Sequence, residues 1–124
     1  MKLVYVIGPL RSDNAEKRNS NIKRAGQVAL DFWEAGFAVI CPHLNSNMAG
    51  NLNSLDEQVF VDGDLVMLKH CDFAVVLDGW DGSIGSIGEI DFCAENSIPY
   101  YFLRNTKGLI TSFKTTQLIK EMEA

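Results

Sequence analysis

The sequence predicts an α/β fold in which a mostly parallel sheet of four or five strands is covered by helices on both faces. Short apolar segments at 3–7, 37–41, 73–77 and 98–103 have the length and composition of strands, and segments with helical spacing lie between them. The strand segments are apolar throughout instead of alternating, which is typical of strands buried on both faces. These observations favour a three-layer sandwich.

The first strand and the helix after it have clear boundaries in the sequence. The strand at 3–7 stops at Gly8-Pro9, because a proline cannot donate to a sheet ladder. Apolar residues then recur at helical spacing over 19–35, and Gly36 follows at the position of a helix terminator. We expect the mixed-charge segment 13–18 to be a solvated loop. The apolar positions of this helix are Ile22, Ala25, Ala29, Phe32 and Trp33.

The rest of the chain completes one expected domain over 1–124. Residues 43–54 are rich in Asn, Ser and Gly, so no regular structure is expected there. Helices are expected over 56–70, with Val61, Leu65 and Leu68 on the apolar face, over 86–96, and over 111–122. A chain of 124 residues, 47% of them hydrophobic, can bury one core but not two.

Composition and charge exclude several classes of function. The net charge of −5 comes without a basic stripe of the kind that neutralises nucleic-acid phosphates. A small phosphorylated ligand remains compatible, because backbone amides and hydroxyls can hold a phosphate. The spacing of Cys41, Cys71 and Cys93 favours reduced core thiols over a disulfide framework or a zinc site. No metal, cofactor or membrane contact is expected, and the cytoplasm is the expected location.

Ligands of open parallel sheets lie beyond the carboxyl ends of the strands. Segments 8–11, 43–45 and 78–86 should therefore meet around one crevice. The last of these opens the glycine-rich stretch DGWDGSIGSIGE, in which glycines allow close approach of a ligand, and Ser83 and Ser86 add donors near a helix start. Its spacing fits neither the dinucleotide-binding fingerprint nor the P-loop.

Glu89 is the candidate reactive residue of this stretch. It lies three residues after Ser86, about one turn into the expected helix, where the helix dipole would keep a carboxylate ionised and able to act as a nucleophile. The same S-x-x-E pattern fits a capping box, in which Glu89 only returns a hydrogen bond to the helix start. The local pattern leaves both interpretations open.

The motifs together resemble the nucleoside 2-deoxyribosyltransferase-like superfamily, which includes nucleotide N-glycosidases and small phage and bacterial proteins of unassigned role. The resemblance covers nearly the whole chain and implies a flavodoxin-like or Rossmann-like sandwich and a homo-oligomer, a dimer or larger. The matching positions are Tyr5, Gly8 and Pro9 with the first strand, Pro42-His43 after the second, the acid-bearing helix segment 60–65, Cys71-Asp72, and Gly82-Ser83 through Glu89.

By this resemblance Glu89 is the nucleophile, and Asp64, with Asp62 as the fallback, assists the leaving base. Relatives that act on free nucleosides tend to carry an acid where this chain has Ser83, whereas nucleotide-cleaving relatives carry a serine that helps to hold the 5′-phosphate. The expected activity is cleavage or exchange of the N-glycosidic bond of a (deoxy)nucleoside or, preferably, a nucleoside 5′-monophosphate. The alternative is a non-catalytic nucleotide-binding or sensor domain of the same fold.

Several candidate binding residues also have a purely structural interpretation. Tyr5 and Trp80 could stack on a base or pack in the core or a lid, and His43 could orient a base or be a plain loop residue. Asp64 could be an ordinary solvated acid, and Arg11 is a phosphate candidate. The candidate binding residues are Tyr5, Gly8, Pro9, His43, Asn45, Trp80, Gly82, Ser83, Gly85 and Ser86.

Overall fold

The computed structural model of the chain describes residues 1–49 and 57–103. Its four strands are β1 (Leu3–Ile7), β2 (Ala38–Ile40), β3 (Phe73–Leu77) and β4 (Tyr100–Leu103). They form one sheet in the order β2-β1-β3-β4, and every neighbouring pair is parallel. This is the strand order of flavodoxin-like folds, with the switch point between β1 and β3. The predicted α/β class with a parallel sheet is confirmed.

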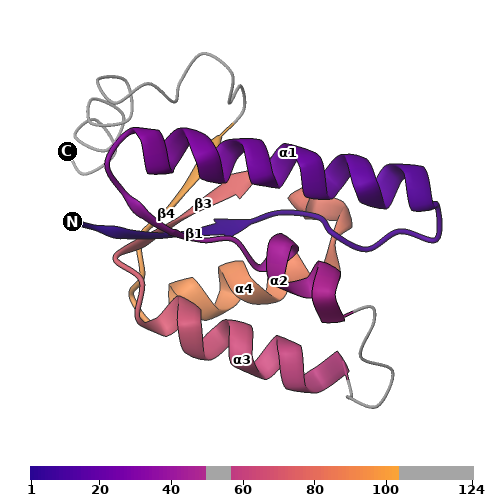
Figure 1. The fold of residues 1–124 in the computed structure, drawn as a ribbon. Helices are drawn as coiled ribbons and strands as arrows, with labels where there is room; N and C mark the ends of the chain where they lie inside the picture. The colour runs from indigo at the N-terminus through magenta and orange to yellow at the C-terminus, as the bar shows by residue number, and fades with distance from the viewer. Residues whose placement is uncertain (50–56, 104–124) are drawn as a thin grey trace.

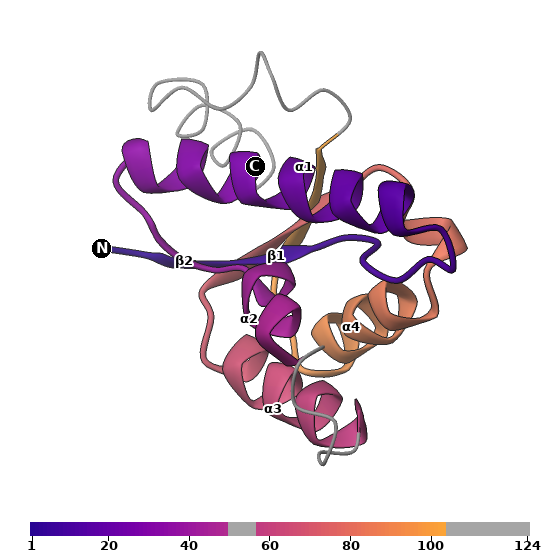
Figure 2. The same ribbon diagram turned by 45° about the vertical axis from the view of Figure 1, so that its right-hand side comes forward.

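Helices lie on both faces of the sheet (Figure 1). The long helix α1 (Ala15–Glu34) covers one face, and α3 (Glu57–Lys69) and α4 (Ile84–Glu95) cover the other. The short helix α2 (Pro42–Ala49) contacts both α1 and α3 (Figure 2), and the 3-10 turn η1 (Trp80–Gly82) precedes α4. The described residues contain no helix that is both long enough and apolar enough to cross a membrane.

Each face of the sheet has its own core, because successive side chains of a strand point to opposite faces. Val4, Val6 and Val75 pack toward α1, against residues such as Phe32. Tyr5, Ile7 and Val76 pack toward α3 and α4, against residues such as Leu68. The three cysteines are buried, as expected of core thiols: Cys41, Cys71 and Cys93.

Helix α1 begins earlier than the apolar spacing predicts. The side chain of Asn14 accepts a hydrogen bond from the N–H of Lys17 at 3.0 Å, and this cap starts the helix at Ala15. The prediction that 13–18 is a solvated loop is therefore wrong from Ala15 onward. The end of the helix is as predicted, since Gly36 follows it with a φ of +95°. Trp33, predicted on the apolar face, is 52% exposed.

The prediction of no regular structure over 43–54 is wrong for its described part. Pro42 occupies the first position of α2, where a missing N–H breaks no helical hydrogen bond. The N–H of Leu44 bonds the carbonyl of Cys41 at 3.1 Å and closes the first turn. Residues 50–56 and the helix expected over 111–122 lie outside the described residues.

Smaller differences concern the ends and faces of other elements. Strand β2 is shorter than the predicted 37–41, and β4 is shorter than the predicted 98–103. Val61, predicted on the inner face of α3, is 39% exposed. The inner face instead includes Asp64, Leu65 and Leu68, of which only Leu68 is fully buried.

Candidate active site

Helix α4 begins two residues earlier than predicted, and this changes the position of Glu89. The hydroxyl of Ser83 accepts a hydrogen bond from the N–H of Ser86 at 3.2 Å, so Ser83 is the cap and Ile84 the first helical residue. The capping box formed by Ser86 and Glu89 is therefore a wrong interpretation. Glu89 lies in the second turn of α4, too far from the helix start to return a bond to it.

The carboxyl of Glu89 is bonded to the central strand of the sheet. The phenol of Tyr5, in β1, donates a hydrogen bond to Glu89 Oε2. Tyr5 is fully buried, which favours the packing interpretation over stacking on a base. Its side chain points into the layer between the sheet and helices α3 and α4, where its hydroxyl holds the glutamate.

Asp64 is the second acid of this cluster. It lies on the inner side of α3, partly exposed, and its charge raises the pKa of Glu89. The fallback Asp62 lies on the exposed side of α3, where its carboxylate accepts a hydrogen bond from Gln58 Nε2 at 2.8 Å. Of the two helix acids, Asp64 is thus the one placed next to Glu89.

Burial decides the protonation of both acids. Loss of solvent raises the pKa of Glu89 to about 8, against the lowering effect of the Tyr5 hydrogen bond. Burial raises the pKa of Asp64 to about 6, and the nearby Arg11 guanidinium opposes that rise. The raised pKa favours a protonated Glu89 near neutral pH in the ligand-free protein, in contrast to the expected ionised carboxylate. In the second turn the helix dipole no longer compensates for burial.

Two thiols and the phenol complete the titratable surroundings of Glu89. Burial and, to a smaller extent, the charge of Glu89 raise the pKa of Cys93, on α4, to about 11. Burial raises the pKa of Cys71 to about 12, with contributions from Asp72 and Cys93. The pKa of Tyr5 is far above its usual value, chiefly because the side chain is buried. All three groups stay neutral near pH 7. The groups of this cluster whose pKa lies close to neutral pH are therefore the two acids, Glu89 and Asp64.

The three segments expected to meet at the carboxyl edge of the sheet do lie together. His43, at the start of α2, is buried, and its Nε2 is 3.1 Å from the carbonyl oxygen of Gly8 and 3.3 Å from that of Pro9. Burial lowers the pKa of His43, so the neutral ring donates from Nε2. The ring fixes the turn after β1 and is not a plain loop residue.

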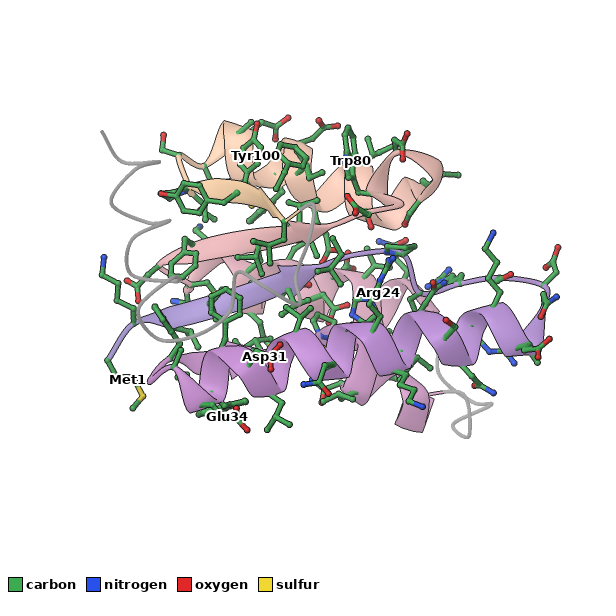
Figure 3. All side chains as sticks on the ribbon, turned by 90° about the horizontal axis from the view of Figure 1, so that it is seen from above. Met1, Arg24, Asp31, Glu34, Trp80 and Tyr100 are labelled. Carbon is green, nitrogen blue, oxygen red and sulfur yellow. The ribbon has the colours of Figure 1, made fainter. Side chains whose placement is uncertain are left out.

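Arg24 and Gly79 connect the turn after β3 to the same edge. Arg24 extends from α1 toward this turn (Figure 3) and its Nη2 donates to the carbonyl oxygen of Asp78 at 2.6 Å. Gly79 has a φ of +91°, and a Cβ on it would be 3.2 Å from Pro9 Cγ. Arg24 was not among the predicted site residues, whereas Gly79 lies in the predicted segment 78–86. A positively charged residue in the third turn of a helix gives no signal that it bonds a carbonyl 54 positions away.

The glycines of the site fall into two groups. A Cβ on Gly8 would be 3.1 Å from Leu77 Cβ, so this glycine lets the ends of β1 and β3 approach each other. By contrast, a Cβ on Gly82 or on Gly85 would have no atom within 4 Å. Packing among the described residues therefore does not require a glycine at 82 or 85, and the space beside the start of α4 is open.

Ser86 faces inward from the first turn of α4. It is 1% exposed, and its hydroxyl oxygen has no hydrogen-bond partner among the described residues. A buried hydroxyl without a partner is uncommon, because it loses its bonds to water and gains none. Ser86 is three residues before Glu89, so the two side chains share one side of the helix. The hydroxyl of Ser86 is thus a buried donor on the same side of α4 as Glu89.

Two predicted binding residues lie elsewhere. The ring of Trp80 packs against Phe102 at a centroid distance of 5.3 Å, over the β4 side of the molecule in Figure 3, which favours the packing interpretation. Asn45 is exposed on α2, and no described contact connects it to Glu89. Pro9, by contrast, lies at the carboxyl edge of the sheet. Its carbonyl oxygen is next to His43 Nε2, and its ring lies beside Gly79.

Comparison with known proteins identifies a family without an assigned activity. A model described as a domain of unknown function (DUF7768) matches residues 2–103. A CTP synthase from Paramagnetospirillum magneticum is 36% identical over 59 residues, which are 45% of this chain and 11% of that enzyme. The matched segment is therefore less than half of this chain and about a tenth of the length of that relative.

Proposed function

The chain belongs to this domain family of unknown function, and we propose that it cleaves or exchanges the N-glycosidic bond of a (deoxy)nucleoside or, preferably, a nucleoside 5′-monophosphate. The observation that carries the proposal is the pair of acids Glu89 and Asp64. They come from two helices on one face of the sheet, and both have a raised pKa. Two interacting acids with perturbed pKa values are typical of enzymes that break glycosidic bonds.

In the proposed reaction Glu89 attacks the anomeric carbon, and the bond from that carbon to the base nitrogen breaks. The base leaves with its bonding electrons and takes a proton from Asp64, through an oxocarbenium-like transition state. The pKa of Asp64, about 6, suits an acid that must hold a proton near neutral pH. Water or a second base then resolves the glycosyl ester, and the two displacements retain the configuration.

The start of α4 supports a phosphate on the substrate. The amide groups of its first turn carry partial positive charge, Ser83 caps it, and the hydroxyl of Ser86 is buried without a partner among the described residues. The open space at Gly82 and Gly85 lets a ligand approach these donors. A 5′-phosphate held here would bring its sugar toward Glu89, which lies one turn further along the helix.

A non-catalytic nucleotide-binding or sensor domain is the second candidate, and the pKa of Glu89 favours it. With a pKa of about 8 this acid is mostly protonated at neutral pH, and a protonated carboxyl is a poor nucleophile. A sensor would use the same donors at the start of α4 and would need no ionised glutamate.

The test is incubation with a panel of nucleosides and their 5′-monophosphates, with and without an acceptor base, followed by chromatography for free or exchanged base. We expect base release, greatest from monophosphates, and a loss of about 1,000-fold or more in the Glu89→Gln variant with ligand binding retained. Asp64→Asn should also lose activity. Asp62→Asn, a matched change on the exposed side of α3, should not.

Three outcomes separate the candidates. Ligand binding without base release from any substrate would support the sensor and reject the enzyme. Turnover that survives Glu89→Gln would reject the role of Glu89. Inversion at the anomeric carbon would reject the two-displacement scheme.

A cytoplasmic location and a homo-oligomer belong to the proposal as well. Light scattering of the purified chain tests the oligomeric state.

A further inference from the structure

We propose that His43 is a positioning residue for the substrate phosphate, which sets the affinity of the site by holding the turn after β1 against the turn after β3. This inference rests on the proposed function, because it concerns the phosphate site at the start of α4. It assigns control of that site to a side chain that does not touch the phosphate. A series of short contacts connects His43 to Ser83, the cap of α4.

The hydrogen-bond partners of the His43 ring fix its tautomer. Nε2 lies 3.1 Å from the carbonyl oxygen of Gly8 and 3.3 Å from that of Pro9. A carbonyl oxygen only accepts, so Nε2 carries the proton, and Nδ1 of the neutral ring is an acceptor. The thiol of Cys41, whose Sγ is 3.9 Å from Nδ1, is then the donor of that contact. The ring thus holds two carbonyl groups of the turn after β1 and is itself held by the residue after β2.

This network is shielded from water. His43 is 3% exposed and Cys41 is 7% exposed, and burial also disfavours a charged ring. If the ring were removed, the carbonyl oxygens of Gly8 and Pro9 would lose this donor, and a buried acceptor without a donor is unfavourable. The turn after β1 would then move to find other donors. His43 therefore determines where this turn lies.

The turn after β1 packs directly on the turn after β3. A Cβ on Gly79 would be 3.2 Å from Pro9 Cγ, so the proline ring lies against the backbone of Gly79. The carbonyl oxygen of Gly79 accepts a hydrogen bond from the N–H of Gly82 at 3.2 Å. The next N–H, of Ser83, bonds the carbonyl oxygen of Trp80 at 3.0 Å. A displacement of Pro9 would therefore be transmitted through η1 to the cap of α4.

The reacting acid has a separate support. Glu89 accepts its hydrogen bond from Tyr5, which lies inside β1 and not in the turn. Strand β1 is paired with β2 on one side and with β3 on the other, so the position of Tyr5 does not depend on His43. Loss of His43 should therefore act on the phosphate end of α4 and spare the chemistry. The expected kinetic signature is a raised KM with little change in kcat.

Two substitutions that differ by one methylene group test this role. The side-chain amide of glutamine can place its N–H near the position of Nε2, whereas the shorter asparagine places it near Nδ1. His43→Gln should keep the affinity for ribose 5-phosphate within about 3-fold of the wild type, because the donor is retained. His43→Asn should lower this affinity by about 10-fold, the equivalent of one hydrogen bond. The loss is partial because Arg24 still holds the carbonyl oxygen of Asp78.

Calorimetry measures the affinity, and initial rates with a nucleoside 5′-monophosphate separate KM from kcat. His70→Gln is the matched control, since His70 is exposed after the end of α3 and is the other of the two histidines. This variant also leaves His43 as the single histidine for nitrogen-15 NMR, which reads the tautomer without any ligand. We expect a protonated Nε2 and an unprotonated Nδ1. Cys41→Ala should move the Nδ1 signal, because its donor is lost, and leave the Nε2 signal in place.

Four results would overturn the inference. The first is a ring protonated on Nδ1 and not on Nε2. The second is equal affinity of the wild type, His43→Gln and His43→Asn for ribose 5-phosphate. The third is a fall in kcat at unchanged KM in His43→Asn, which would place the effect on the chemistry. The fourth is a wild-type protein that binds no ribose 5-phosphate, which would reject the phosphate site as well.

The base-release assay separates these failures from failure of the proposed function. Base release from monophosphates together with equal affinities in the two His43 variants would reject the role of His43 and leave the enzyme. The expected affinities in a protein that releases no base from any substrate would reject the enzyme. They would support His43 as a positioning residue of a nucleotide-binding domain.

Discussion

The hydroxyl of Tyr5 donates a hydrogen bond to Oε2 of Glu89, and this bond connects the central strand β1 to the second turn of α4. Tyr5 is fully buried, so its hydroxyl has little freedom to move. The bond orients the carboxyl and favours its ionised form, because a donor stabilises the charge on the acceptor. It is the interaction that keeps the pKa of Glu89 from rising further with burial.

Tyr5→Phe should therefore raise the pKa of Glu89 and lower activity near neutral pH. The acid limb of the pH profile of kcat/KM should move to higher pH, and kcat/KM at pH 7 should fall by about 10- to 100-fold. The free energy of unfolding should change by no more than about 1.5 kcal/mol, because one hydrogen bond is lost without a cavity. Initial rates across pH 5–10 measure the effect.

Tyr100→Phe is the control for this change. Tyr100 lies on the edge strand β4 and packs against Phe102, so removal of its hydroxyl should leave the pH profile unchanged. An identical profile in wild type and Tyr5→Phe would mean that the phenol does not act on Glu89 in solution.

The raised pKa of Glu89 makes stability depend on pH in a direction that can be measured. The folded pKa is about 8 and the unfolded value is about 4.3. Between these values the folded state binds the extra proton, so the free energy of unfolding falls as pH rises from about 4.3 to 8. The Glu89→Gln variant has no carboxyl at this position, so it should not show this fall in the free energy of unfolding. It should stabilise the protein at pH 8.5 by on the order of 2 kcal/mol after allowance for partial exposure, and change little at pH 4.5.

Urea unfolding at several pH values compares the two proteins. Asp62→Asn, which removes an exposed carboxylate, should show the pH dependence of the wild type. Parallel curves for wild type and Glu89→Gln between pH 5 and 8.5 would show that Glu89 has an ordinary pKa.

The strands were predictable from sequence, and the surroundings of the two acids were not. Continuous apolar segments indicate buried parallel strands, whereas Glu89 and Asp64 were chosen through the resemblance to a family and not from the local pattern alone. Helix starts were missed where a single cap decides them, at Asn14 for α1 and at Ser83 for α4. The pKa of Glu89 depends on which groups pack around it from β1 and α3, and that information is absent from local sequence.

The turn after β3 depends on Gly79 far more than on its neighbour Gly82. Gly79 has a φ of +91° and little room beside Pro9, so Gly79→Ala should destabilise the protein by about 1–2 kcal/mol or more. Gly82→Ala adds a Cβ that meets no described atom within 4 Å and should change stability by less than about 0.5 kcal/mol. Thermal or urea unfolding of both variants measures the difference. Equal stability would mean that the turn adopts another conformation in solution.

Gly85 offers a test in which stability and ligand binding should change in opposite directions. It lies in the first turn of α4, exposed, with open space around it. Alanine forms helices better than glycine, so Gly85→Ala should stabilise the protein by up to about 0.5–1 kcal/mol. The added methyl group would occupy the space through which a phosphate approaches the first amide groups, so the affinity for ribose 5-phosphate should fall by about 10-fold. Calorimetry measures both quantities.

Gly88→Ala adds the same methyl group about one turn later, where it should stabilise the helix without weakening binding. If Gly85→Ala binds ribose 5-phosphate as tightly as Gly88→Ala does, the phosphate is not held at the start of α4.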